Sequence, residues 1–248
     1  MPEIFRERTL FSIFALFLLL FFFGCEGSGD LNEVSSSSQS SNPQELIREA
    51  TERQRIGAYD EAIIILLKVL ELDPKSVPAF YRMGLVYDEA DRRNEAINSF
   101  NNALKINPQN LPARLGLGEV YSKMTRNDLA VVEFLKAESL QPGNTKILFK
   151  IALEYWYDQK LNEAGQYYQK VIAINPKHTQ AHLNLISVYE KLKDWEKAMG
   201  EIEISKQLGK ENNDAQTISI AERKLAFIKG RMNMTEKDYK RKSQPPFD

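Results

Sequence analysis

The feature that most constrains the fold is a set of prolines that recur at a constant interval. They stand at Pro74, Pro108, Pro142 and Pro176, 34 residues apart. An alanine comes twelve residues before each proline, at Ala62, Ala96, Ala130 and Ala164, and Ala198 continues the series. Bulky side chains and tyrosines keep the same period, at Leu66, Phe100, Phe134 and Tyr168 and at Tyr87, Tyr121, Tyr155 and Tyr189. Such self-similarity indicates a chain built from repeated units.

Each period has the pattern of two packed helices. Apolar or small residues recur at helical spacing at Phe80, Met83, Gly84 and Tyr87. Small residues at Gly84 and Ala96 allow two antiparallel helices to approach closely, since a larger side chain there would overpack the contact. A proline ends the second helix because it disfavours helical geometry in the residue before it.

This pattern resembles the tetratricopeptide repeat, a helix–turn–helix unit of 34 residues. The resemblance covers five units, at 43–76, 77–110, 111–144, 145–178 and 179–212. It implies an all-α, right-handed superhelical solenoid with a concave groove lined by the first helix of each unit. Glu49 and Arg53 replace apolar residues in the first unit, and Ile186 and Lys210 depart from the pattern in the fifth. End units that face solvent on one side are expected to differ in this way.

The chain continues beyond the fifth unit. Residues 213–230 are predicted to form a capping helix that begins at Asp214 and ends at Gly230. The face that packs on the last repeat is expected to carry Ile218, Ala221, Leu225 and Ile228. Residues 231–248 form a polar, basic tail, which we interpret as solvated.

The N-terminus has the pattern of an export signal. Leu10 to Phe23 is a run of fourteen residues without a charge. A membrane-spanning helix needs about 20 apolar residues, whereas the core of a signal peptide needs roughly 7–15. Gly24 and then Cys25, the single cysteine of the chain, follow the run.

This ending resembles the lipobox of bacterial lipoproteins, although Phe22 and Phe23 depart from its usual residues. The resemblance implies that residues 1–24 are removed as a signal peptide and that Cys25 carries acyl chains. The serine-rich segment 25–43 would then be a flexible tether, spanning about 23 Å root-mean-square. The alternative is an uncleaved signal anchor.

No pattern points to catalysis, a cofactor or a metal. The net charge of −1 disfavours a general nucleic-acid binder, and one cysteine excludes a disulfide framework or a cysteine-based zinc site. His178 and His182 are four residues apart, but no carboxylate or cysteine accompanies them nearby. We therefore expect no enzymatic activity, no small-molecule substrate and no nucleic-acid partner.

The resemblance also implies which side chains face the groove. The candidate partner-binding residues are Tyr81, Arg82, Leu85, Leu115, Glu119, Lys146, Phe149, Lys150, Leu153, Trp156, Tyr157 and Leu183. The fourth unit is the richest in aromatic residues, which are frequent anchors of binding hot spots. These aromatics face the groove or pack into neighbouring units; the sequence favours the groove for Phe149 and Leu153 and leaves both placements open for Trp156 and Tyr157.

The expected ligand of this groove is an apolar or amphipathic segment of a protein. A clamp for a peptide's terminal carboxylate is not expected, because Tyr81 and Leu85 stand where the family's clamp has lysine and asparagine.

Together these patterns predict a lipid-anchored scaffold or assembly factor of the bacterial envelope. The plan is similar to that of pilotin-type and outer-membrane assembly lipoproteins with tetratricopeptide repeats. It implies a location at the outer membrane, facing the periplasm or the cell surface. Two alternatives are an inner-membrane scaffold that keeps its signal anchor, and an accessory or chaperone-like subunit of an envelope enzyme complex.

Overall fold

The computed structural model describes residues 42–232, which contain eleven α-helices and no β-strand. The prediction of an all-α solenoid with a further C-terminal helix is confirmed. The predicted signal peptide, Cys25, the tether up to residue 41 and the tail from residue 233 lie outside the described residues. The helices are α1 (Pro43–Arg55), α2 (Tyr59–Leu72), α3 (Val77–Glu89), α4 (Arg93–Ile106), α5 (Leu111–Lys123), α6 (Asn127–Leu140), α7 (Thr145–Tyr157), α8 (Leu161–Ile174), α9 (Thr179–Leu192), α10 (Trp195–Glu211) and α11 (Ala215–Met232).

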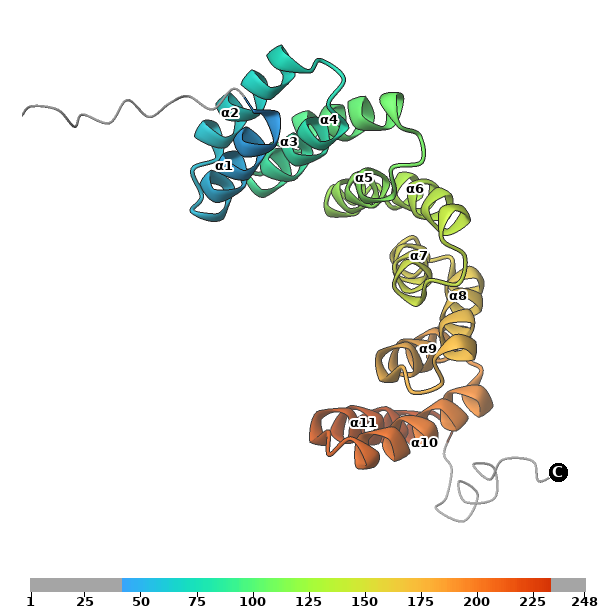
Figure 1. Ribbon diagram of the computed structural model, residues 1–248. Coiled ribbons are helices and arrows are strands. Elements are labelled where there is room, and N and C mark those ends of the chain that lie inside the picture. The colour runs from blue at the N-terminus through green and yellow to red at the C-terminus, as the bar shows by residue number, and fades with distance from the viewer. Residues whose placement is uncertain (1–41, 233–248) are drawn as a thin grey trace, which may run out of the picture. The chain divides into compact units, whose positions relative to one another are not determined.

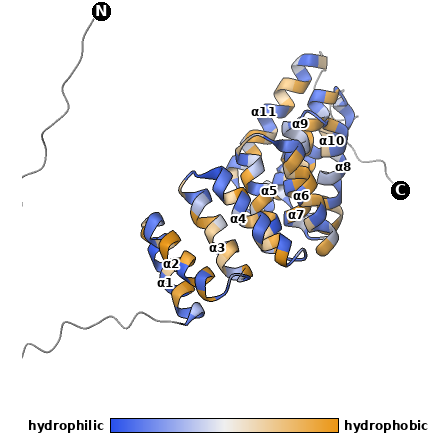
Figure 2. Ribbon diagram, turned by 90° about the horizontal axis from the view of Figure 1, so that it is seen from above, coloured by the Kyte–Doolittle hydropathy of each residue, from blue (hydrophilic) through white to orange (hydrophobic). Residues whose placement is uncertain are grey.

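The helices pack as consecutive pairs, each against the next (Figure 1). The stack carries hydrophobic and hydrophilic residues throughout (Figure 2), and each helix buries apolar side chains. First helices of neighbouring pairs also meet directly, α1 with α3, α3 with α5, and α9 with α11. No two second helices among the described residues make comparable contact. The first helices therefore lie on the side of the stack where successive pairs come closest.

The recurring prolines lie in the turns after the second helices, as predicted. Helices α2, α4, α6 and α8 each end two residues before a proline. Three of these turns are closed by a side chain that accepts a hydrogen bond from the backbone two residues on. The acceptors are the Oδ1 atoms of Asp73, Asn107 and Asn175, at 3.1, 3.0 and 3.2 Å from the nitrogen. The turn chemistry is thus local and repeats with the period.

Phe100 of α4 shows why small residues recur in the first helices. Its side chain is fully buried. A Cβ atom added to Gly84 of α3 would lie 2.5 Å from the ring, and one added to Gly116 of α5 would lie 2.6 Å from it. Gly118 has the same relation to Phe134, at 2.6 Å. The glycines therefore leave room for a phenylalanine between successive pairs.

The C-terminal helix differs from the prediction in one respect. Asp214 caps α11, since its Oδ1 accepts from the Thr217 nitrogen at 3.0 Å. The helix does not end at Gly230 but continues to Met232. Glycine in a helix costs only about 1 kcal/mol relative to alanine, and buried Ile228 holds the last turn against the stack.

Candidate functional site

From α3 onward, polar contacts join each first helix to the next. Between α3 and α5, Asp88 Oδ2 lies 2.7 Å from Lys123 Nζ. Between α5 and α7, Glu119 Oε1 lies 2.9 Å from Lys150 Nζ. We call the surface formed by the twelve candidate residues of α3, α5, α7 and α9 the first-helix face. The structure brings two of those residues, Glu119 and Lys150, together as an ion pair.

Contacts between successive first helices continue toward the C-terminus. Lys191 of α9 places its Nζ 5.0 Å from the centre of the Trp156 ring on α7, a cation–π contact. Lys224 of α11 forms an ion pair with Glu190 of α9. Of the three ion pairs, Glu119–Lys150 is exposed on both sides and such pairs contribute little to stability. Asp88 and Glu190 are largely buried, at 12% and 11% exposed, so their lysine partners compensate buried charges between neighbouring repeats.

Helix α7 carries the most accessible part of the first-helix face. Tyr157 is 59% exposed, and Lys146 is exposed as well. Leu153 and Trp156 are partly buried against the C-terminal core. These four side chains combine apolar surface, two aromatic rings and a lysine on one helix.

Phe149 has an internal role in the structure. Its ring packs edge-on to Tyr168 with centroids 5.6 Å apart and stacks on His178 at 5.0 Å. Leu183 is only 8% exposed and belongs to the same core. Phe149 and Leu183 therefore contribute to the core beneath the first-helix face more than to its exposed surface.

The candidates of the second and third units are also largely held by the core. Tyr81 and Leu85 pack around Phe100, and the Tyr81 and Phe100 rings have centroids 6.0 Å apart. Leu115 packs in the next cluster along the chain. Arg82 is partly exposed. The accessible side chains therefore concentrate on α7.

A buried carboxylate, Glu154 of α7, was missed by the sequence analysis. It is 4% exposed, and its Oε1 accepts from Ser122 Oγ at 2.7 Å, while Oε2 has no partner among the described residues. Burial raises the pKa of Glu154, although the Ser122 hydrogen bond and the charge of Lys150 oppose the shift. Its register offered a signal, because the corresponding residues of other units are Val86, Val120 and Val188.

Within residues 42–232, the contacts of the two histidines are those of structural side chains. His178 caps α9, with Nδ1 accepting from the Ala181 nitrogen at 3.2 Å. His182 is buried, with Nδ1 2.5 Å from Glu201 Oε2 and Nε2 2.9 Å from the Pro176 carbonyl oxygen. In residues 42–232 no group of three histidine, cysteine or acidic side chains could hold a metal ion.

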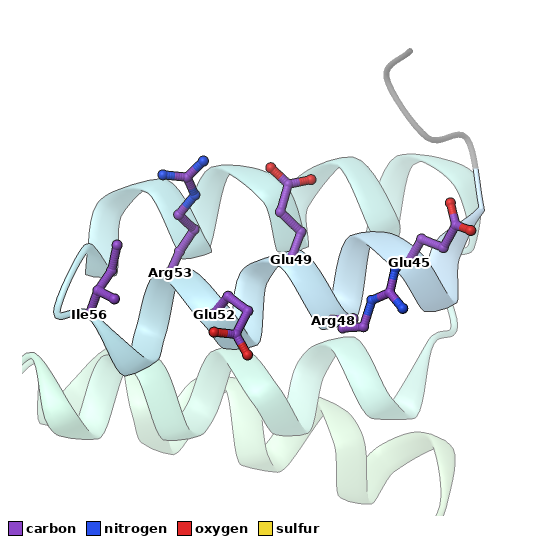
Figure 3. A pocket seen from close by; sticks show the side chains of 6 residues that line it. All are labelled: Glu45, Arg48, Glu49, Glu52, Arg53 and Ile56. Atoms are coloured by element: carbon purple, nitrogen blue, oxygen red, sulfur yellow. The ribbon is translucent and has the colours of Figure 1, made fainter. Parts of the chain in front are cut away.

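The N-terminal end of the stack is charged. A hollow of about 410 Å³ lies along α1, lined by Glu45, Arg48, Glu49, Glu52, Arg53 and Ile56 (Figure 3). Glu49 and Arg53 are the two residues that break the repeat pattern, and Arg53 Nη1 lies 3.1 Å from Glu61 Oε2. A repeat packed before α1 would have to bury these charges, so this surface suits a solvated end.

Sequence models of the tetratricopeptide repeat match residues 48–76, 77–110 and 155–217. The chain belongs to the tetratricopeptide repeat family. A comparison with curated proteins finds no significant match. None of the helices between residues 42 and 232 is long and apolar enough to cross a membrane.

Solved structures share the fold. YrrB, described as a TPR protein with an unusual peptide-binding site, aligns with a TM-score of 0.61 at 23% identity, covering 74% of this chain and 93% of its own. MamA aligns with a TM-score of 0.64 at 20% identity, covering 70% and 95%. A MamA structure from Desulfovibrio magneticus RS-1 gives 0.62 at 18% identity, covering 70% and 97%. At these identities the likeness concerns the fold.

Proposed function

We propose that this protein is a membrane-anchored scaffold or assembly factor of the bacterial envelope that binds a partner protein on its first-helix face. The observation that carries the proposal is the surface of α7, where exposed Tyr157 lies on the same helix as partly exposed Leu153 and Trp156. Tryptophan and tyrosine are enriched among the residues that dominate binding energies.

The chemistry of α7 favours an apolar or amphipathic partner segment. Leu153, Trp156 and Tyr157 offer apolar surface, and Lys146 adds a charge at the edge. An amphipathic helix or an extended strand could lay its apolar side on these residues. The fold-level likeness to YrrB, described as having a peptide-binding site, supports the same reading.

The anchor is proposed from the sequence. Cys25 follows an apolar run of signal-peptide length and precedes a serine-rich segment. One acyl chain gives only marginal membrane affinity, so stable attachment takes two or more, as a bacterial lipoprotein carries. Glu26 after the cysteine favours the outer membrane over retention at the inner membrane.

Partner recovery from native membranes tests the binding surface. A Trp156→Ala, Tyr157→Ala double variant should recover much less partner than the wild type after mild crosslinking. Ile64→Ala, which removes an exposed apolar side chain from the second helix α2, is the matched control and should recover as much as the wild type. Equal recovery by all three proteins, with helical content intact, would reject the first-helix face.

Mass spectrometry of the mature N-terminus tests the anchor. The proposal expects a chain that begins at Cys25 and carries acyl mass, and a Cys25→Ser variant that leaves the membrane fraction. An intact Met1 or an unmodified Cys25 would contradict it and would favour the signal-anchored alternative.

A further inference from the structure

A second hollow, on the side of the second helices, has a composition that repeat packing does not explain. It measures about 590 Å³ and lies between α4, α5 and α6. Helix α4 lines it with three amides, those of Asn98, Asn101 and Asn102. Arg114 of α5 and Lys136 of α6 also face it. Its volume lies within the usual range of small-ligand sites, about 300–1,000 Å³.

The floor of this hollow is a largely buried ion pair. Arg114 and Glu133 are 12% and 10% exposed, and Arg114 Nη1 lies 2.8 Å from Glu133 Oε2. Lys136 Nζ donates to the other carboxylate oxygen at 2.7 Å, and Arg114 Nη2 donates to the Pro108 carbonyl at 2.6 Å. Both oxygens of the single carboxylate are thus occupied by cations.

The charges that line the hollow therefore sum to a positive excess. Besides Arg114 and Lys136 there is Lys105, whose Nζ reaches only the Asn102 Oδ1, at 3.5 Å. Lys105 has no carboxylate partner among the described residues. Three cations and one carboxylate leave two positive charges for a ligand.

Two of the three amides also have N–H donors that are not used within the described residues. The side-chain amides of Asn98 and Asn101 make no hydrogen bond within residues 42–232, and their spacing puts them on one face of α4. The corresponding residues are Ile64 and Leu67 in the first unit and Val132 and Leu135 in the third. The repeat folds with apolar side chains at these positions, so packing does not require the amides.

The fourth unit is a useful comparison. It has amides at the corresponding positions, Gln166 and Gln169, but Gln169 Nε2 is already bonded to the Tyr189 hydroxyl at 2.8 Å. Where the second unit has Lys105, the fourth has Ala173. Free amides and an uncompensated lysine therefore occur together in the hollow beside α4.

We infer that this hollow binds a small molecule bearing carboxylate or phosphate groups. The oxyanion would lie between Lys105 and the Arg114–Lys136 floor, where charge-assisted hydrogen bonds are about twice as strong as neutral ones. Asn98 and Asn101 would donate their amide N–H groups to the remaining oxygens. This site is separate from the first-helix face and does not depend on the partner proposed above.

Titrations of the full chain followed by NMR test this inference. The probes are citrate and inorganic phosphate, each against sodium chloride at matched ionic strength. We expect at least one probe to shift the side-chain amide signals of Asn98 and Asn101 saturably, and the probe that binds tells carboxylate from phosphate chemistry. Lys105→Gln should weaken that binding at least fivefold. Lys68→Gln, at an exposed lysine in the register position of Asn102 on α2, should leave it unchanged.

A second variant distinguishes loss of binding from loss of the folded structure. Asn98→Val combined with Asn101→Leu installs the residues that the third unit carries at these positions, and it should abolish binding while thermal unfolding stays close to that of the wild type. Three results would overturn the inference: no saturable shift with either probe, equal weakening by Lys68→Gln, or full binding by the Val/Leu variant.

Discussion

Phe100 packs against glycines of both the second and the third repeat. Its buried ring occupies the space that side chains on Gly84 and Gly116 would need. The repeat pattern predicted a small residue at position 84. It did not predict one at position 116, where glycine is needed because the Phe100 ring extends as far as α5. Position 116 corresponds to Arg82 and Lys150 in neighbouring units, so the period alone does not call for glycine there.

Gly116→Ala should therefore lower the free energy of unfolding by about 1–3 kcal/mol, because the added methyl overpacks the core. Urea denaturation measures the change. Gly200→Ala is the control, since no atom lies within 4 Å of the added Cβ in α10. It should stabilise the protein by roughly 0.5–1 kcal/mol through helix propensity. An unchanged midpoint for Gly116→Ala would contradict the packing account.

Glu154 gives a prediction about pH. Its pKa is raised by burial, so the folded state favours the protonated acid. The stability that protonated Glu154 contributes is present below its ordinary pKa and is lost as the pH rises through the raised value. Glu154→Gln should keep that contribution at neutral pH and unfold at a higher urea concentration than the wild type.

Urea midpoints of both proteins between pH 4 and pH 7.5 check this. The difference between them should grow with pH. A constant difference would show that the folded state does not raise the pKa of Glu154, and a difference that shrinks with rising pH would show that its carboxylate is stabilised in the folded protein.

At the scale of elements, an equivalent, largely buried polar cluster occurs twice, two repeats apart. Arg114 contacts Glu133 and the Pro108 carbonyl, and His182 contacts Glu201 and the Pro176 carbonyl. Each residue of the second cluster lies two repeats after its counterpart in the first. The two clusters differ in the cation that faces the carbonyl, since arginine is always charged whereas histidine titrates.

The neighbours of His182 favour its charged form. An ionised carboxylate and a carbonyl oxygen can only accept, and only a protonated imidazole donates from both nitrogens. Burial lowers the pKa of His182, but the hydrogen bonds to Glu201 and Pro176 outweigh it, so the pKa lies above its ordinary value. The stability from this cluster is therefore full below the ordinary pKa and is lost as the pH rises through the raised one.

His182→Arg should remove this loss, because arginine already occupies the equivalent cluster. Melting temperatures between pH 5.5 and pH 9 should fall with rising pH in the wild type and fall less in the variant. Parallel curves would show that His182 does not titrate in this range. Lys170→Gln, which changes an exposed charge on α8, serves as a control for net charge.

How far the sequence predicts a structure of this kind depends on what each residue contacts. The prolines and the alanine series predicted the helical pairs because their effects are local to one repeat. The first-helix face was predicted only as a set of positions. Phe149 shows the limit: its position faces the groove in the family, but here Tyr168 and His178 hold its ring. Such contacts depend on neighbouring side chains that no period specifies.

At the scale of the whole molecule, the proposals place the anchor, the partner surface and the anion site in separate parts of the chain. The anchor rests on Cys25, before the repeats. The partner surface centres on α7, and the anion site lies beside α4. Each can therefore be removed without disturbing the others, and loss of one activity should leave the other two intact.

Site-specific photo-crosslinking in native membranes shows whether a partner docks against α7. A photoreactive amino acid replaces Tyr157 in one sample and Ile64, on the second helix α2, in the other. We expect a discrete adduct with a single partner from position 157 and none from position 64. Absence of an adduct at position 157, or the same adduct from both positions, would contradict it.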